Sequence, residues 1–164
     1  MPVNKKIKKV AIVMGSQSDY SIMKKCEEIL KTLKIKYETK IISAHRTPDR
    51  MFEFAKNATK NNFAVIVAGA GGAAHLPGMI ASMSILPIIG VPIETKKLEG
   101  LDSLLSIVQM PKGIPVGTVA IGENGAFNAG LLAASIIALF DDKTKKNLEK
   151  WRRLQTIAIK KKPN

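Results

Sequence analysis

The 164-residue chain is poor in residues that build cross-links and metal sites, with one cysteine and two histidines. Because the single cysteine, Cys26, cannot form an intramolecular disulfide or a C-x-x-C site, we expect a chain that works in the reducing cytoplasm. The two histidines form no H-x-x-x-H pair and the carboxylates are not clustered, so we expect no metal. Aromatic residues make up only 5% of the chain and hydrophobic residues 46%, which predicts the aliphatic core typical of a sheet covered by helices on both faces.

Several familiar motifs and long apolar runs are also absent. The sequence has no G-x-x-x-x-G-K-S/T phosphate loop and no G-x-S-x-G elbow, which argues against nucleotide hydrolysis and serine acyl transfer. The longest apolar stretches, residues 79–93 and 126–140, are shorter than the roughly 18–20 residues of a membrane span. The apolar stretch after the basic N-terminus is too short for a signal peptide. We therefore expect neither a membrane partner nor export.

Acidic residues are scarce, with 13 Asp and Glu against 26 Lys and Arg and a formal net charge of +13. Most of the excess lies at the two ends of the chain. Residues 1–10 hold four Lys and no acid, and residues 141–164 hold nine Lys or Arg against three acids. Basic residues at chain ends usually form solvated surfaces. We therefore expect no nucleic-acid partner and keep an RNA-associated basic protein only as an alternative.

Short apolar runs alternate with segments of helical periodicity. Strands are predicted at residues 9–15, 36–42, 63–68, 87–90 and 115–120. Helices are predicted at residues 18–34, from Thr47-Pro48-Asp49 onward, and at 76–83, 101–108, 124–140 and 143–160. This alternation predicts a three-layer αβα fold with a flavodoxin-like parallel sheet in the order 2-1-3-4-5 and an extra C-terminal helix. The length fits a single domain, residues 1–164, with a core at about residues 8–140.

A parallel sheet of this order binds ligands at the carboxyl ends of its strands, where the strand order reverses. Three polar loops, at residues 15–19, 43–47 and 69–75, should therefore converge. The first, Gly15-Ser16-Gln17-Ser18-Asp19, places two hydroxyls and several backbone N–H groups at a helix N-terminus, where phosphate is favoured. The alternative is that Ser18 only caps the helix and Asp19 complements its dipole.

The second loop, Ser43-Ala44-His45-Arg46-Thr47-Pro48, carries a hydroxyl, an imidazole and a guanidinium. An imidazole titrates near pH 6.5, roughly, so His45 can both give and take a proton in one reaction cycle. Arg46 can bind phosphate or carboxylate through its two-pronged fork. The loop therefore predicts proton transfer on an anionic small molecule.

The third loop is glycine-rich and runs from Gly69 to Gly78. Glycine lets the backbone approach a ligand closely because it has no side chain. Gly69, Gly71 and Ala74 also match the G-x-G-x-x-A dinucleotide fingerprint, but the match follows the third strand and Pro77 interrupts the expected long helix. His75 either lines the site or caps the following helix.

Four segments, in this order along nearly the whole chain, closely resemble the N5-carboxyaminoimidazole ribonucleotide mutase family of bacterial purine synthesis. They are residues 15–19, 43–48, 69–79 and Asp102-Ser103-Leu104-Leu105-Ser106-Ile107-Val108-Gln109-Met110-Pro111. The resemblance implies an isomerase that moves a carboxylate from the exocyclic N5 of an aminoimidazole ribonucleotide to ring carbon C4, in IMP biosynthesis. It also implies that the chain needs no cofactor and that its partner is a small-molecule ribonucleotide.

The resemblance also assigns roles to residues. His45 matches the general acid/base, which protonates the substrate so that CO2 leaves and later removes the C4 proton. The substrate-binding positions match Ser16, Asp19 and Arg46, with Arg46 and the serine loop suited to phosphate and Asp19 to ribose hydroxyls. Positions around the base and CO2 match Ser43, Gly71, Ala74, His75 and Leu76.

The family further implies a homo-octamer, in which the C-terminal helix around Trp151 packs on a neighbouring subunit. Related carboxylases that use free CO2 carry Lys in place of Arg46 and lack the stretch 73–78, so the resemblance favours the mutase. Direct carboxylation of aminoimidazole ribonucleotide and, more remotely, a flavodoxin-like nucleotide-binding module are the alternative functions.

Overall fold

The computed structural model describes residues 8–163, and within them five parallel strands form one sheet. The strands are β1 (Lys9–Met14), β2 (Tyr37–Ile41), β3 (Phe63–Gly71), β4 (Ile88–Ile93) and β5 (Gly117–Thr118). They lie in the order β2-β1-β3-β4-β5, and every neighbouring pair is parallel. The predicted flavodoxin-like sheet is confirmed. Lys5 and Lys6, which belong to the basic N-terminal segment, lie outside the described residues.

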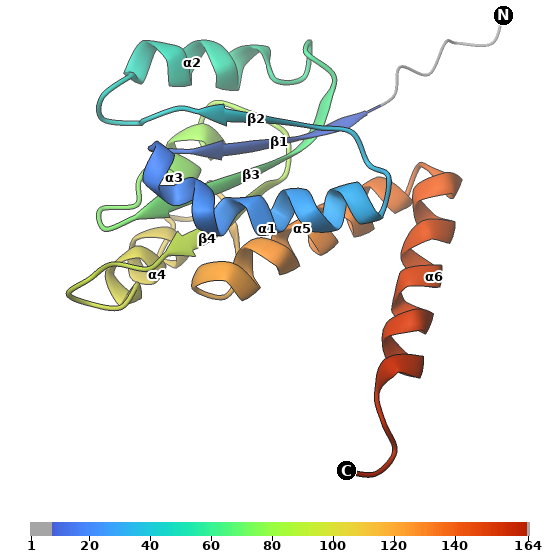
Figure 1. The fold of residues 1–164 in the computed structure, drawn as a ribbon. Coiled ribbons are helices and arrows are strands. Elements are labelled where there is room, and N and C mark those ends of the chain that lie inside the picture. The colour runs from blue at the N-terminus through green and yellow to red at the C-terminus, as the bar shows by residue number, and fades with distance from the viewer. Residues whose placement is uncertain (1–7, 164) are drawn as a thin grey trace, which may run out of the picture.

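Helices cover both faces of this sheet (Figure 1). They are α1 (Tyr20–Thr32), α2 (Pro48–Asn57), α3 (Leu76–Ala81), α4 (Leu101–Val108), α5 (Gly122–Ala138) and α6 (Asp142–Ala158), with a short 3-10 turn at Gln17–Asp19. Alternate residues of β1 divide between two buried clusters. Val10 and Ile12 pack with α1 and α5, whereas Ala11 and Val13 pack with α2, α3 and α4. Of the helices in the described part of the chain, none is long and apolar enough to cross a membrane.

The third, fourth and fifth strands differ from their predicted lengths. The strand predicted at residues 63–68 continues to Gly71. The strand predicted to end at Gly90 continues to Ile93, and the strand predicted at residues 115–120 pairs only over Gly117–Thr118. β5 pairs with β4 only at Ile89 and Gly90. Pro92 lies past this pairing, so its missing N–H costs no hydrogen bond to β5. β4 therefore tolerates a proline that reads in sequence as a strand breaker.

α1 and α5 lie close together because Gly130 has no side chain. A Cβ at Gly130 would lie 2.4 Å from Ile29 Cγ2 and 3.1 Å from the Cys26 carbonyl oxygen. Cys26 lies in this contact and is fully buried, and burial raises the pKa of its thiol. The buried, protonated thiol of Cys26 is a packing group without nucleophilic character.

α6 leaves the body of the molecule after its first half (Figure 1). The Asp141 carboxylate accepts the Thr144 N–H at 2.9 Å and caps the helix, and Leu148 is buried. Trp151 then packs on Phe127 of α5 with a centroid distance of 6.1 Å. Beyond Trp151 the next residues on this side of the helix, Leu154, Gln155 and Ala158, are exposed in the single chain.

Candidate active site

The three polar loops predicted to converge do meet at the carboxyl edge of the sheet. They line a cleft of about 310 Å³ together with the end of β4. The lining residues are Gly15, Ser16, Asp19, Ser43, Ala44, His45, Arg46, Ala70, Gly71, Ala73, His75, Leu76, Ile93, Glu94 and Thr95. A cleft of this volume is the size of a small-molecule site.

The serine loop forms the first wall. Ser16 has extended backbone angles before the 3-10 turn, and its hydroxyl lies 2.5 Å from the Ser18 hydroxyl. The Ser18 hydroxyl donates to Asp19 Oδ1 at 3.3 Å, and no side-chain bond caps either the turn or α1. The alternative role of Ser18 as a helix cap is therefore wrong. Of the two hydroxyls, that of Ser16 lines the cleft and can contact an anion there.

The second wall is a turn that closes on itself between β2 and α2. The Ser43 N–H donates to Thr47 Oγ1 at 2.9 Å, and the Thr47 hydroxyl donates back to the Ser43 carbonyl at 3.0 Å. Thr47 is at the N-cap position and Pro48 begins α2. The Thr47 hydroxyl bonds within this turn and makes no capping hydrogen bond to the backbone amides of the helix. The turn fixes the direction in which His45 and Arg46 leave the backbone.

Arg46 ties the first two walls together. Its Nε donates to the Ser43 hydroxyl at 3.2 Å, and its Nη2 donates to the Gly15 carbonyl at 2.8 Å. These two contacts hold the guanidinium beside the serine loop, of which Gly15, Ser16 and Asp19 line the same cleft. Arg46 and this loop can together bind a phosphate.

The glycine-rich loop forms the third wall and is held from behind by α4. The Ser103 hydroxyl accepts the Gly72 N–H at 2.9 Å and donates to the Ile93 carbonyl at 2.7 Å. The Ser106 hydroxyl donates to the Gly72 carbonyl at 3.2 Å. Gly72 has a positive φ of 67°, which glycine adopts without strain. The fourth segment of the predicted resemblance therefore supports the wall without lining the cleft.

The two histidines face each other across the cleft. His45 Nε2 lies 2.8 Å from His75 Nδ1, and the rings are nearly perpendicular with centroids 4.9 Å apart. His75 occupies the N-cap position of α3, but its side chain makes no capping bond. Of its two predicted roles, His75 therefore lines the site. Their contact needs one ring to donate and the other to accept, so it is broken when both nitrogens carry protons.

Asp19 is the acidic residue of the serine loop and lines the cleft. Burial raises the pKa of its carboxyl above the usual value, and hydrogen bonds within its own loop and the charge of Arg46 oppose the shift. A carboxylate whose ionisation is disfavoured in the folded state destabilises the fold at neutral pH. Such a cost is typical of a residue kept for binding and not for stability.

We expect Asp19→Asn to raise the midpoint of thermal unfolding at pH 7. Because the folded-state pKa is raised, the ionised carboxylate costs stability above it, and the cost is absent once Asp19 is protonated in both states, below about pH 4. The difference between variant and wild type should therefore shrink as the pH falls. The midpoints of thermal unfolding of both proteins, measured at several pH values between about pH 3 and 8, give this difference. A variant less stable than wild type at pH 7 would contradict this assignment.

One residue predicted to surround the base and CO2, Ala74, does not line the cleft. It is buried beside Leu76 in the core, because the chain turns there into α3. The dinucleotide fingerprint also fails. Gly69 lies inside β3 against Met23, and α3 is only six residues long, so no long helix begins at the glycines.

Other lining residues were missed. Glu94 and Thr95 line the cleft because β4 runs three residues further than predicted, which carries its carboxyl end into the site. The polar pair after an apolar run was the available signal. No group of three or more His, Cys, Asp or Glu in residues 8–163 is arranged to hold a metal ion.

Comparisons with known proteins agree with this geometry. A family model described as AIR carboxylase matches residues 9–157. The N5-carboxyaminoimidazole ribonucleotide mutase of Brucella melitensis is 56% identical over 155 residues, which cover 94% of this chain and 96% of that protein. The corresponding protein of Bacillus subtilis is 57% identical over 143 residues, 87% of this chain and 88% of that protein. The crystal structure of Treponema denticola PurE superposes with a TM-score of 0.81 at 27% identity, covering 91% of this chain and 92% of that one. The chain belongs to the AIR carboxylase family.

Proposed function

We propose that the chain is an N5-carboxyaminoimidazole ribonucleotide mutase of purine biosynthesis. The observation that carries the proposal is the placement of His45 in one cleft with Arg46 and the serine loop. A proton-transferring imidazole and a phosphate-binding guanidinium are what this reaction needs of a protein. Relatives that bear this name are more than half identical over nearly the whole chain.

The substrate is a ribonucleotide, and the cleft offers a place for each part of it. Arg46 and the Ser16 loop bind the phosphate, and the Asp19 carboxylate accepts ribose hydroxyls. The imidazole base then lies between the second and third walls, where Ser43, Gly71 and Leu76 line the space for it and for CO2. Ala74, which is buried, supports this wall from behind.

The reaction balances with one proton shuttled by His45. His45 protonates N5 as the N5–carboxylate bond breaks, so the products of this step are CO2 and aminoimidazole ribonucleotide. A C4–carbon bond then forms to the same CO2, and His45 takes back the C4 proton. Before the reaction starts, the hydrogen bond to His75 holds the His45 ring at the wall of the cleft.

Two sequence features favour the mutase over direct carboxylation with free CO2. Arg46 is present where the carboxylases of the family carry Lys, and residues 73–78 are intact. If the chain is a mutase, purified protein should convert the N5-carboxylated ribonucleotide without added bicarbonate or metal. If the protein acts only on aminoimidazole ribonucleotide plus bicarbonate, it is a direct carboxylase and not a mutase.

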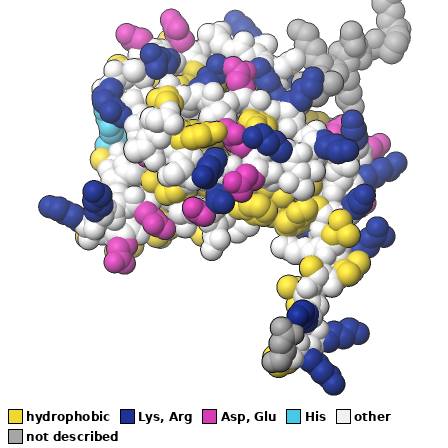
Figure 2. Space-filling view, in the orientation of Figure 1, with side chains coloured by type: hydrophobic (Ala, Val, Ile, Leu, Met, Phe, Trp, Pro, Cys, Tyr) yellow, Lys and Arg dark blue, Asp and Glu magenta, His cyan; other side chains and the backbone are white. Residues whose placement is uncertain are grey.

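We also propose that the chain assembles as a homo-octamer and works in the cytoplasm. Leu101, Leu105 and Val108 form an exposed apolar stripe along α4. Figure 2 shows hydrophobic side chains on the side of α6 turned toward the body and Lys and Arg on its outer side. Apolar surfaces of this kind usually contact another subunit. Cys26, single and buried, suits a reducing compartment.

The C-terminal half of α6 provides the test of assembly. Ile157 is 71% exposed in the single chain, so Ile157→Asp should not unfold a monomer. In an octamer the same charge would be buried at an interface without a partner and should shift the protein to smaller species. Sedimentation velocity measures this, with Lys150→Asp as the control. A wild-type monomer would overturn the proposed assembly.

A further inference from the structure

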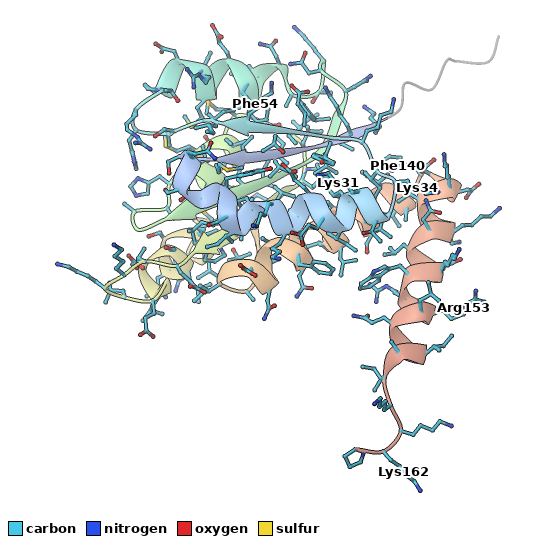
Figure 3. All side chains as sticks on the ribbon, viewed as in Figure 1. Lys31, Lys34, Phe54, Phe140, Arg153 and Lys162 are labelled. Atoms are coloured by element: carbon cyan, nitrogen blue, oxygen red, sulfur yellow. The ribbon has the colours of Figure 1, made fainter. Side chains whose placement is uncertain are left out.

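A second cavity lies at the opposite edge of the sheet from the active site. It has a volume of about 440 Å³ and opens between the α1–β2 turn and the junction of α5 with α6. Its lining residues are Lys8, Lys34, Ile35, Lys36, Ile137, Phe140, Asp141, Lys143, Thr144 and Asn147. Lys8 precedes β1 and Lys36 precedes β2, so this cavity is at the amino ends of the strands. Figure 3 shows Lys34 and Phe140 at the place where α1 ends and α6 begins.

Positive charge is concentrated on the rim of this cavity. Lys8, Lys34, Lys36 and Lys143 come from three separate parts of the chain, and none of them forms an ion pair with a residue that the structure describes. One acid, Asp141, stands against these four ammonium groups, and its carboxylate already accepts the Thr144 N–H. The rim therefore attracts an anion that carries more than one negative charge.

The floor of the cavity is apolar. Ile35 and Ile137 are almost fully buried, with 6% and 3% of their surfaces exposed, whereas Phe140 is 46% exposed. A half-exposed phenyl ring beside two aliphatic side chains offers a flat surface on which a planar group can stack. The cavity volume lies within the usual range for small-molecule sites.

We propose that this cavity binds a nucleoside phosphate, with the phosphates on the lysines and the base against Phe140. A simple inorganic anion would leave the apolar floor uncovered, and a fatty acid would bring only one charge to four ammonium groups. A nucleoside diphosphate satisfies both the rim and the floor. The cavity lies between the body of the molecule and the start of α6. A ligand bound there therefore also contacts the first turn of α6, whose C-terminal half is exposed.

A simpler explanation accounts for only part of this arrangement. Lys34 lies just after the C-terminus of α1, where a cation complements the helix dipole, and isolated surface lysines are common. Neither fact explains why lysines from before β1, before β2 and from α6 surround one apolar hollow.

Isothermal titration of the full chain with ADP, pyrophosphate and adenosine tests the proposal. The titrations are done in the Arg46→Ala background, so that binding in the catalytic cleft is weakened. We expect ADP to bind more tightly than pyrophosphate, and adenosine to bind weakly. Lys143→Glu should weaken ADP binding by about tenfold or more, since it replaces a charge-assisted contact by repulsion. An acid in the first turn also suits the α6 dipole, so α6 should stay folded.

Two further variants separate the parts of the site. Lys146→Glu makes the same charge change on an exposed α6 residue that does not line the cavity, and it should leave ADP binding unchanged. Phe140→Ala should weaken ADP binding and leave pyrophosphate binding as it was. The proposal is overturned if ADP fails to bind, if Lys146→Glu weakens binding as much as Lys143→Glu, or if pyrophosphate binds as tightly as ADP.

Discussion

Replacing His45 by asparagine should lower the turnover of N5-carboxyaminoimidazole ribonucleotide by about 10²- to 10⁴-fold, the usual contribution of a general acid/base. Asparagine lacks the ring nitrogen that meets His75 Nδ1, and it cannot carry a proton between N5 and C4. The loss should appear in kcat with little change in KM, because Arg46 and the serine loop bind the ribonucleotide without His45. Steady-state kinetics at saturating substrate measures the effect.

The fold of this variant should be intact, because His45 is exposed and, among the described residues, its side chain hydrogen-bonds only to His75. Thermal unfolding of variant and wild type should therefore coincide within about one or two degrees. A His45→Asn protein with wild-type turnover would remove His45 from the mechanism.

Replacing Arg46 by alanine should raise KM by roughly ten- to a hundredfold, since a charge-assisted hydrogen bond contributes about 1.5–3 kcal/mol. The variant loses the phosphate contact and also the bond to the Gly15 carbonyl that draws the first two walls together. Arg46→Lys keeps the charge without the fork and should fall between alanine and wild type.

Arg50 offers a matched control for this substitution. It lies in the first turn of α2 and donates to the Ile41 carbonyl at 3.3 Å, outside the catalytic cleft. Arg50→Ala should leave KM unchanged in the same assay. Equal effects of the two alanine variants would mean that Arg46 acts through general surface charge and not through a phosphate contact.

Most of the fold could be predicted because the central strands, β1, β3 and β4, are buried on both faces. β1 and β3 appear in the sequence as short, continuous apolar runs, and helical periodicity between them leaves a parallel order as the simplest connection. The end of β4 could not be predicted, because whether Pro92 breaks a strand depends on how far β5 pairs beside it. That length is a property of the assembled sheet.

Some features of the site could likewise be predicted from the sequence, and others could not. His45 and Arg46 could be found from sequence because their loop follows a strand end. The contact of Arg46 with the Gly15 carbonyl, 31 residues away, depends on β1 and β2 being neighbours. From the sequence alone, His75 could either line the site or cap the following helix. Its contact with His45, which lies on another loop, decides between these two roles. Ala74 was predicted to surround the base and CO2 but is buried. In a tight turn, adjacent residues can differ in whether they line a cleft or face the core, and the sequence does not show which.

The Lys-rich ends of the chain have a purpose in this account beyond solubility. Lys8 and Lys143 belong to the two basic terminal segments, and the fold brings them to one cavity. Their role is independent of the catalytic cleft, so loss of nucleotide binding at the second cavity would leave the mutase assignment unchanged.

The fate of the substrate's own carboxylate carbon tests the central claim most directly. Unlabelled N5-carboxyaminoimidazole ribonucleotide is converted in the presence of ¹³C-bicarbonate, and the label in the product carboxylate is measured by mass spectrometry. If His45 works in a cleft that retains CO2, the product keeps the unlabelled carbon and the rate does not depend on bicarbonate. A product labelled to the level of the added bicarbonate would show that CO2 leaves and re-enters from solution, and would contradict the mutase.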